Sequence, residues 1–205
     1  ALINTAAIIY PIVIFFALFS FELIPLYLSD KYSSSFIVFS IFNLAILFKI
    51  TSYEDIYIAS KNSSLLPSKY LIVAILNIIL NVVLIYLFGI EGAAISTLVS
   101  FIVLIVLLVK DSVKIIDVSV NELIPFKDIF KLFTICSLLG VGVLGLYVLI
   151  DNLLIIPVLA ILFFGSSYYY VLKEDYLEKI VVRDFLGRSK LMKPFLAIFN
   201  KLYSK

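Results

Sequence analysis

Histidine is absent from this sequence, and cysteine occurs once, at Cys136 inside a hydrophobic run. Without histidine the chain lacks the commonest general base and metal ligand, so no Ser/His/Asp or Cys/His catalytic set can form. A single cysteine cannot form a disulfide within the chain. The Gly-rich phosphate-binding loop of ATP-hydrolysing proteins is missing as well. We therefore expect a protein that is not an enzyme, with no catalytic residue, no metal site and no cofactor.

Charged residues are also scarce. They make up 15% of the 205 residues, whereas 63% are hydrophobic and the mean hydropathy is +1.18. A soluble globular chain carries about 25% charged and about 45–50% apolar residues. A chain of this size cannot bury such an excess in one core. The composition therefore predicts that lipid is the solvent for much of its surface.

Hydrophobic runs long enough to cross a bilayer recur along the chain. A helical span needs about 20 mostly apolar residues. Six runs meet this length, at residues 3–28, 36–60, 70–88, 90–109, 129–150 and 153–172. Each run is much longer than the roughly 10 residues of a membrane barrel strand. The pattern predicts an all-α fold, a polytopic bundle of six transmembrane helices, with kinks at Pro11 and Pro25 in the first run.

Positive charge is unevenly distributed over the joints between these runs. Apart from Lys31 and Lys49, all of the 16 basic residues lie in or beside the joints 61–69 and 110–128, or after residue 172. They are Lys61, Lys69, Lys110, Lys114, Lys127, Lys131, Lys173, Lys179, Arg183, Arg188, Lys190, Lys193, Lys201 and Lys205. Cytoplasmic loops carry the excess of lysine and arginine in membrane proteins. The distribution predicts that both termini lie on the cytoplasmic side.

The last segment, 173–205, differs in character from the six runs. Apolar residues recur in it at helical spacing with lysines between them, which is typical of an amphipathic helix lying on a membrane surface. A disordered basic end is the alternative. At the other end the chain opens at Ala1, directly in a hydrophobic run, so we expect it to be a piece of a longer chain or a processed one.

Charged side chains inside the runs require an explanation, because each costs roughly 2.5–3.5 kcal/mol at the centre of a membrane helix. Lys49 lies near the middle of the second run, with Tyr53 on the same helical face and Glu54 and Asp55 beside it; Glu22 lies in the first run. In one interpretation Lys49 and Tyr53 line a cavity that attracts an anionic substrate, and the three acids carry coupling protons or cations. In the other, Lys49 pairs with an acid and fixes helix packing.

Asn77 and Asn81 lie four residues apart in the third run. Amides in membrane helices usually bond to a neighbouring helix, although these two are also candidates for substrate contact. In the fifth run, Gly140, Gly142 and Gly145 match the G-x-G-x-x-G pattern of nucleotide-binding loops. No strand precedes them, so the pattern indicates helix packing and not nucleotide binding.

The sequence around the joint of the third and fourth runs carries a family resemblance. Residues 76–98 read LNIILNVVLIYLFGIEGAAISTL, with matching positions at Asn77, Asn81, Gly89, Gly92, Ala93, Ala94 and Thr97. This resembles the helical hairpin of the polysaccharide flippase branch of the multidrug/oligosaccharidyl-lipid/polysaccharide exporter superfamily, the Wzx-like O-antigen transporters. The segment IPLYLSDKY at 24–32 is similar to the end of a family helix, with Leu28 and Ser29 where Phe and Gly are common.

The resemblance implies a fold and a function. Such flippases have about twelve to fourteen helices in two lobes around a central cavity, and this chain would be the C-terminal part. They move undecaprenyl-pyrophosphate-linked oligosaccharide across the cell inner (cytoplasmic) membrane for O-antigen, lipopolysaccharide and other surface polysaccharide biosynthesis. Lys49 would suit the anionic pyrophosphate. The implied partners are this lipid-linked substrate, membrane lipid, and a glycan polymerase and ligase, with no nucleic acid.

Three alternatives remain open at this point. The first is a drug or metabolite efflux transporter of the same superfamily. The second is a membrane-embedded glycan polymerase or ligase, which would need a large outer loop with basic catalytic residues; the outer joints here are short and contain one lysine, Lys31. The third is a noncatalytic scaffold, which would not require Lys49 within a run.

Overall fold

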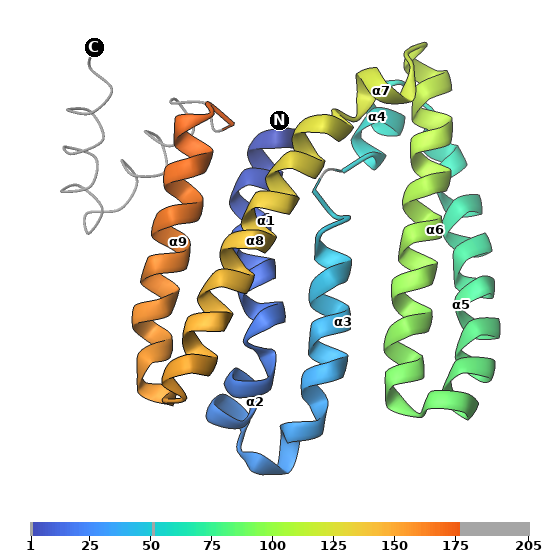
Figure 1. Cartoon of the computed structure of the whole chain (residues 1–205). Helices are drawn as coiled ribbons and strands as arrows, with labels where there is room; N and C mark the ends of the chain where they lie inside the picture. The colour runs from blue at the N-terminus through green and yellow to red at the C-terminus, as the bar shows by residue number, and fades with distance from the viewer. Residues whose placement is uncertain (1, 51, 177–205) are drawn as a thin grey trace, which may run out of the picture.

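The computed structural model describes residues 2–50 and 52–176, and over these ranges it consists of helices with no strand (Figure 1). The α-helices are α1 (Leu2–Leu18), α2 (Ser20–Leu28), α3 (Phe36–Ile46), α4 (Glu54–Ala59), α5 (Leu66–Phe88), α6 (Ile90–Ile116), α7 (Val120–Leu123), α8 (Phe126–Ile150) and α9 (Ile156–Lys173). Short 3-10 helices lie between them: η1 (Asp30–Ser35), η2 (Ser63–Leu65) and η3 (Leu153–Ile155). The all-α prediction is confirmed for this part of the chain. Most of the expected amphipathic tail, from residue 177 onward, lies outside the described residues.

The long apolar helices identify a multi-pass membrane protein. Four of them are long and apolar enough to cross a bilayer: Ser63–Phe88, Ile90–Ile116, Phe126–Ile150 and Leu153–Lys173. The pair α1 and α2 makes a fifth if it is counted as one bent span. The third to sixth predicted runs lie within these four helices. The first two runs are both interrupted.

The first run is divided at Phe19 by a bend of 78° between α1 and α2. Phe19 is fully buried, and the next residue, Ser20, donates a hydrogen bond from its Oγ to the Ala17 carbonyl oxygen at 3.0 Å. Such back-bonding by serine competes with the helical ladder and bends helices. Pro11 and Pro25 lie inside the two helices. The large bend is therefore at Phe19 and not at either proline.

The second run is divided as well, and the prediction of one continuous helix over 36–60 is wrong. The helix α3 has 11 residues, or about 16 Å, and the next α-helix, α4, begins only at Glu54. Lys49 lies in this break, so it does not share a helical face with Tyr53 and Tyr57. The physical reason is tertiary: Ile50 is buried in one hydrophobic core and Tyr53 in another.

The two cores involve different helices. The first contains Phe15, Leu132 and Phe163, and so joins α1, α8 and α9. The second contains Tyr57 and Leu108 and joins α4, α5 and α6. Between them, α3 packs against α1 on one side and α6 on the other (Figure 1). The break after α3 therefore lies where the two cores meet.

The helix ends fall into two groups at opposite ends of the molecule. The start of α1, α4, α7 and the end of α9 lie at one end (Figure 1). At the other end lie α2, the turn between α5 and α6, and the turn between α8 and α9. Within the described residues, the basic joints 61–69 and 110–128 thus occupy the same end, as an even number of crossings between them requires.

Glycines are needed where helices approach closely. Gly89, in the turn between α5 and α6, has a φ of 63°, a left-handed conformation that favours glycine. A Cβ atom at Gly92 would overlap the carbonyl oxygen of Leu84 in the facing helix, so the two helices of the hairpin approach each other closely there. In α8, Gly140 packs against α1, whereas Gly142 faces open space.

Candidate functional site

A pocket lies between the α3–α4 break and the middle of α6. It has a volume of about 230 Å³. The break and the start of α4 contribute Phe48, Lys49, Ser52, Tyr53, Glu54 and Asp55, and α6 contributes Phe101, Leu104, Ile105 and Leu108. Whole-ligand pockets usually measure about 300–1,000 Å³, so this pocket is smaller than a typical site for a whole ligand. Four of the seven residues predicted for the site are therefore brought together.

The charges at this pocket are close in sequence but are not neutralised by one another. Lys49 is exposed, and no ion pair joins it to Glu54 or Asp55 in the residues that the structure describes. Tyr53 is buried at the base of α4 and belongs to the second core. The pocket thus presents a free ammonium group beside two carboxylates and the aromatic rings of Phe48 and Phe101.

Glu54 has a partner on a different helix. The hydroxyl of Tyr70, in the second turn of α5, donates a hydrogen bond to Glu54 Oε1 at 2.7 Å. A hydrogen bond to a carboxylate is roughly twice as strong as one between neutral groups. Sequence reasoning did not identify Tyr70, since nothing local relates it to a residue 16 positions earlier.

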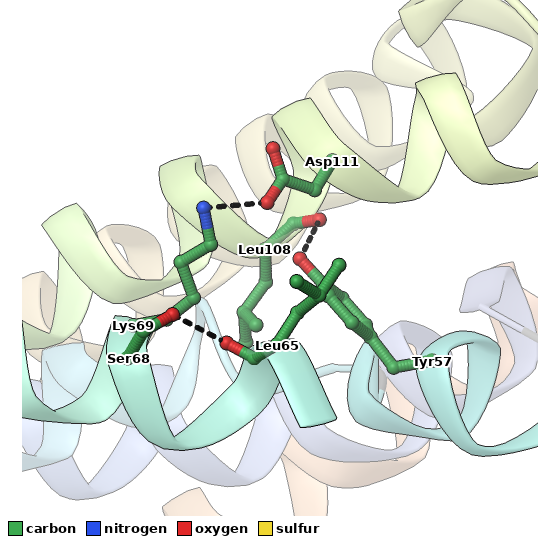
Figure 2. Close-up of polar contacts among 6 residues, drawn as sticks. All are labelled: Tyr57, Leu65, Ser68, Lys69, Leu108 and Asp111. Carbon is green, nitrogen blue, oxygen red and sulfur yellow. Dashed lines mark hydrogen bonds and ion pairs between the residues drawn. The ribbon is translucent and has the colours of Figure 1, made fainter. Parts of the chain in front are cut away.

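A polar cluster fastens α4, α5 and α6 together next to the pocket (Figure 2). Lys69 Nζ and Asp111 Oδ2 form an ion pair at 2.6 Å between α5 and α6. The hydroxyl of the buried Tyr57 donates a long hydrogen bond, 3.4 Å, to the Leu108 carbonyl oxygen. The sequence did contain a signal for the ion pair. Lys69 and Asp111 are almost equally distant from the turn at Gly89, so a helical hairpin places them opposite each other.

The amides of Asn77 and Asn81 lie away from this pocket, in the contact between α5 and α6. Asn77 Nδ2 donates to Ser100 Oγ at 3.2 Å, and Asn81 Nδ2 donates to Asn77 Oδ1 at 2.9 Å. Ser96 Oγ in turn donates to Asn81 Oδ1 at 2.5 Å. These hydrogen bonds give both amides partners within the contact between two membrane helices. Neither residue lines the pocket at the α3–α4 break.

Glu22 lies near the opposite end of the molecule, in α2 (Figure 1). It lines an open pocket of about 790 Å³. The other lining residues are Phe21, Pro25, Leu26, Tyr147, Asp151, Asn152 and Leu153. The Oε2 atom of Glu22 is buried and has no hydrogen-bond partner in the described part of the chain. The three predicted coupling acids are therefore divided between two pockets, with Glu54 and Asp55 beside Lys49 and Glu22 remote from it.

Neither a metal site in the described residues nor a similarity to a known protein assigns a function to the two pockets. Within residues 2–50 and 52–176, no group of three or more His, Cys, Asp or Glu side chains is arranged to hold a metal ion. No protein-family model, curated protein or solved structure matches the chain.

Proposed function

We propose that the chain is a membrane transporter of the flippase type, which moves a lipid-linked oligosaccharide carrying a pyrophosphate across the cytoplasmic membrane. The observation that carries the proposal is the pocket at the α3–α4 break. There Lys49, which has no ion-pair partner among the described residues, is exposed within a long apolar stretch beside two carboxylates and aromatic rings. A buried structural lysine would instead be paired.

The interrupted helices support a transport role. Substrate sites in transporters are typically formed where a membrane helix is discontinuous, because the freed backbone and polar side chains there face a cavity. Both α1–α2 and α3–α4 are interrupted within apolar runs. Each interruption places acidic side chains in a pocket, Glu22 in one and Glu54 with Asp55 in the other.

The chemistry of the α3–α4 pocket suits a glycan linked to a phosphate. The Lys49 ammonium group would bind a phosphate oxygen, and the rings of Phe48, Tyr53 and Phe101 would pack against a sugar ring. Glu54 and Asp55 would accept hydrogen bonds from sugar hydroxyl groups or carry the coupling proton or cation. Glu22 would serve coupling at the far end of the molecule. The chain would act as the C-terminal part of a two-lobed transporter in surface polysaccharide biosynthesis.

The proposed topology has six membrane crossings and both termini in the cytoplasm. It treats α1 with α2 and α3 with α4 as two broken spans in addition to the four long helices. The basic joints then lie on the cytoplasmic side, as the distribution of lysine and arginine favours.

Replacement of Lys49 tests the proposal. In cells that depend on this protein for a surface glycan, Lys49→Ala should lower surface glycan display by about tenfold or more, because a hydrogen bond to a charged group contributes about 1.5–3 kcal/mol. Lys49→Arg, which keeps the charge, should retain most of the display.

The matched control is Lys31→Ala, since Lys31 is exposed but lies outside both pockets. Each variant's amount in the membrane is measured in parallel. Normal glycan display by Lys49→Ala at a normal protein level would refute the proposal. Impaired efflux of a small drug with unchanged glycan display would indicate the exporter instead.

A further inference from the structure

Glu54 and Lys49 line the same pocket, five positions apart in the chain, and yet they form no ion pair. Lys49 is exposed and Glu54 is half-buried, so the attraction between their charges is weak. A competing interaction of one partner is enough to keep the carboxylate away from the ammonium group.

The competing interaction is the hydrogen bond from Tyr70. Its hydroxyl donates to Glu54 Oε1 at 2.7 Å, a short bond to a charged acceptor. Tyr70 follows Lys69 in α5, and the ion pair of Lys69 with Asp111 fixes this turn of α5 against α6. The hydroxyl is thus presented from a rigid hairpin, while Glu54 is the first residue of the short helix α4.

We propose that Tyr70 is a positioning residue: its hydroxyl holds the Glu54 carboxylate towards α5 and so keeps the Lys49 ammonium group available for an anionic ligand. The importance of this for transport rests on the proposed function of Lys49. The positioning itself does not, because it concerns only how three side chains of this chain are arranged.

The first test is coupling with a membrane-permeant carbodiimide, applied to the chain in native membranes. The reagent joins a carboxylate and an amine that are in contact, by forming an amide bond and taking up the water released. In the wild type, Lys49 and Glu54 should not couple. In Tyr70→Phe, which keeps the ring and removes the hydroxyl, they should couple. The product is a peptide one water lighter in which trypsin no longer cleaves after Lys49.

Two variants control this experiment. Tyr86→Phe makes the same chemical change on α5 at a tyrosine that is 89% exposed and forms no hydrogen bond in the described chain, and it should behave as the wild type. Tyr70→Phe combined with Glu54→Gln removes the carboxylate, and coupling to position 54 should disappear. Fragment masses assign the amide to Glu54 or to Asp55.

The second readout is the reactivity of the Lys49 amine towards a small acylating reagent. It should fall by about tenfold in Tyr70→Phe, on the scale expected for one charge-assisted contact, and recover in the double variant with Glu54→Gln. Lys31 reactivity serves as the internal standard. A purely structural role of Tyr70 would not give recovery on removal of a carboxylate.

Three results would overturn the proposal. The first is coupling of Lys49 to Glu54 in the wild type, and the second is its absence in Tyr70→Phe. The third is wild-type coupling of Lys49 to Asp55, since the ammonium group would then already have a partner. None of these readouts requires substrate or transport, so failure of the flippase proposal and failure of the positioning proposal give different results.

Discussion

Lys69 and Asp111 form an ion pair whose side chains are each about one-fifth exposed. The pair joins α5 to α6 near the ends of the hairpin that face the basic joints (Figure 2). For a partly buried pair, the cost of removing one partner comes mainly from the charge that is left unpaired. The attraction within the ion pair therefore contributes little to stability, whereas replacing one of the two residues alone by a neutral one is costly.

Neutralising one partner should destabilise the protein more than neutralising both. We expect Asp111→Asn to lower the stability by about 1–3 kcal/mol, because Lys69 then loses its carboxylate partner. The double variant Lys69→Met with Asp111→Leu should recover most of this loss. Thermal unfolding of the detergent-solubilised variants measures both effects. Equal losses in the single and double variants would mean that the charges are already solvated separately.

The α5–α6 hairpin depends on the absence of a side chain at Gly92. The facing Leu84 carbonyl occupies the space that a Cβ atom would need. Backbone atoms cannot move aside as the end of a flexible side chain can. Four polar side chains of the hairpin, Asn77, Asn81, Ser96 and Ser100, bond to one another only while this separation is kept.

Gly92→Ala should therefore separate the two helices and lower the unfolding temperature. We expect a cost of about 1–3 kcal/mol, the usual range for overpacking. Gly142→Ala is the matched control, because a Cβ atom there has no heavy atom within 4 Å. That variant should unfold at or slightly above the wild-type temperature, since alanine favours the helix over glycine. A similar fall in both variants would contradict the close approach at Gly92.

The elements differ in how far their sequence predicts them. The helices α5, α6, α8 and α9 were predicted because hydropathy over about 20 residues is a local property. The break at 47–53 was not, because it depends on Ile50 and Tyr53 belonging to different cores, which no local pattern records. In the site, the grouping of Lys49 with Glu54 and Asp55 was predicted because these residues are close together in the chain. Tyr70 reaches Glu54 only through tertiary packing.

The arrangement of the helix ends in the molecule determines which joints face water on the same side of the membrane. The joints containing Ser64 and Asn121 lie at the end where α4 and α7 are found, and the α2–α3 joint containing Lys31 lies at the opposite end (Figure 1). If both ends of the molecule reach water, residues at these joints become accessible from different sides of the membrane.

Single introduced cysteines test this arrangement. In a Cys136→Ser background, a membrane-impermeant thiol reagent applied to intact cells should label Lys31→Cys. It should label Ser64→Cys and Asn121→Cys only after the cells are opened. Labelling of Asn121→Cys but not Ser64→Cys in intact cells would place these two joints on different sides and exclude the six-span topology. Cys136 is the single cysteine of the sequence, so in this background the introduced thiol is the group that the reagent can label.

The bend at Phe19 also has a consequence for the surrounding lipid. Ending α1 there leaves 17 residues, or about 26 Å, for the straight part of the first run. The apolar part of α6 before Lys110 is about 30 Å long, which matches an average hydrocarbon layer. Hydrophobic mismatch would therefore favour a thinner bilayer beside α1 than beside α6.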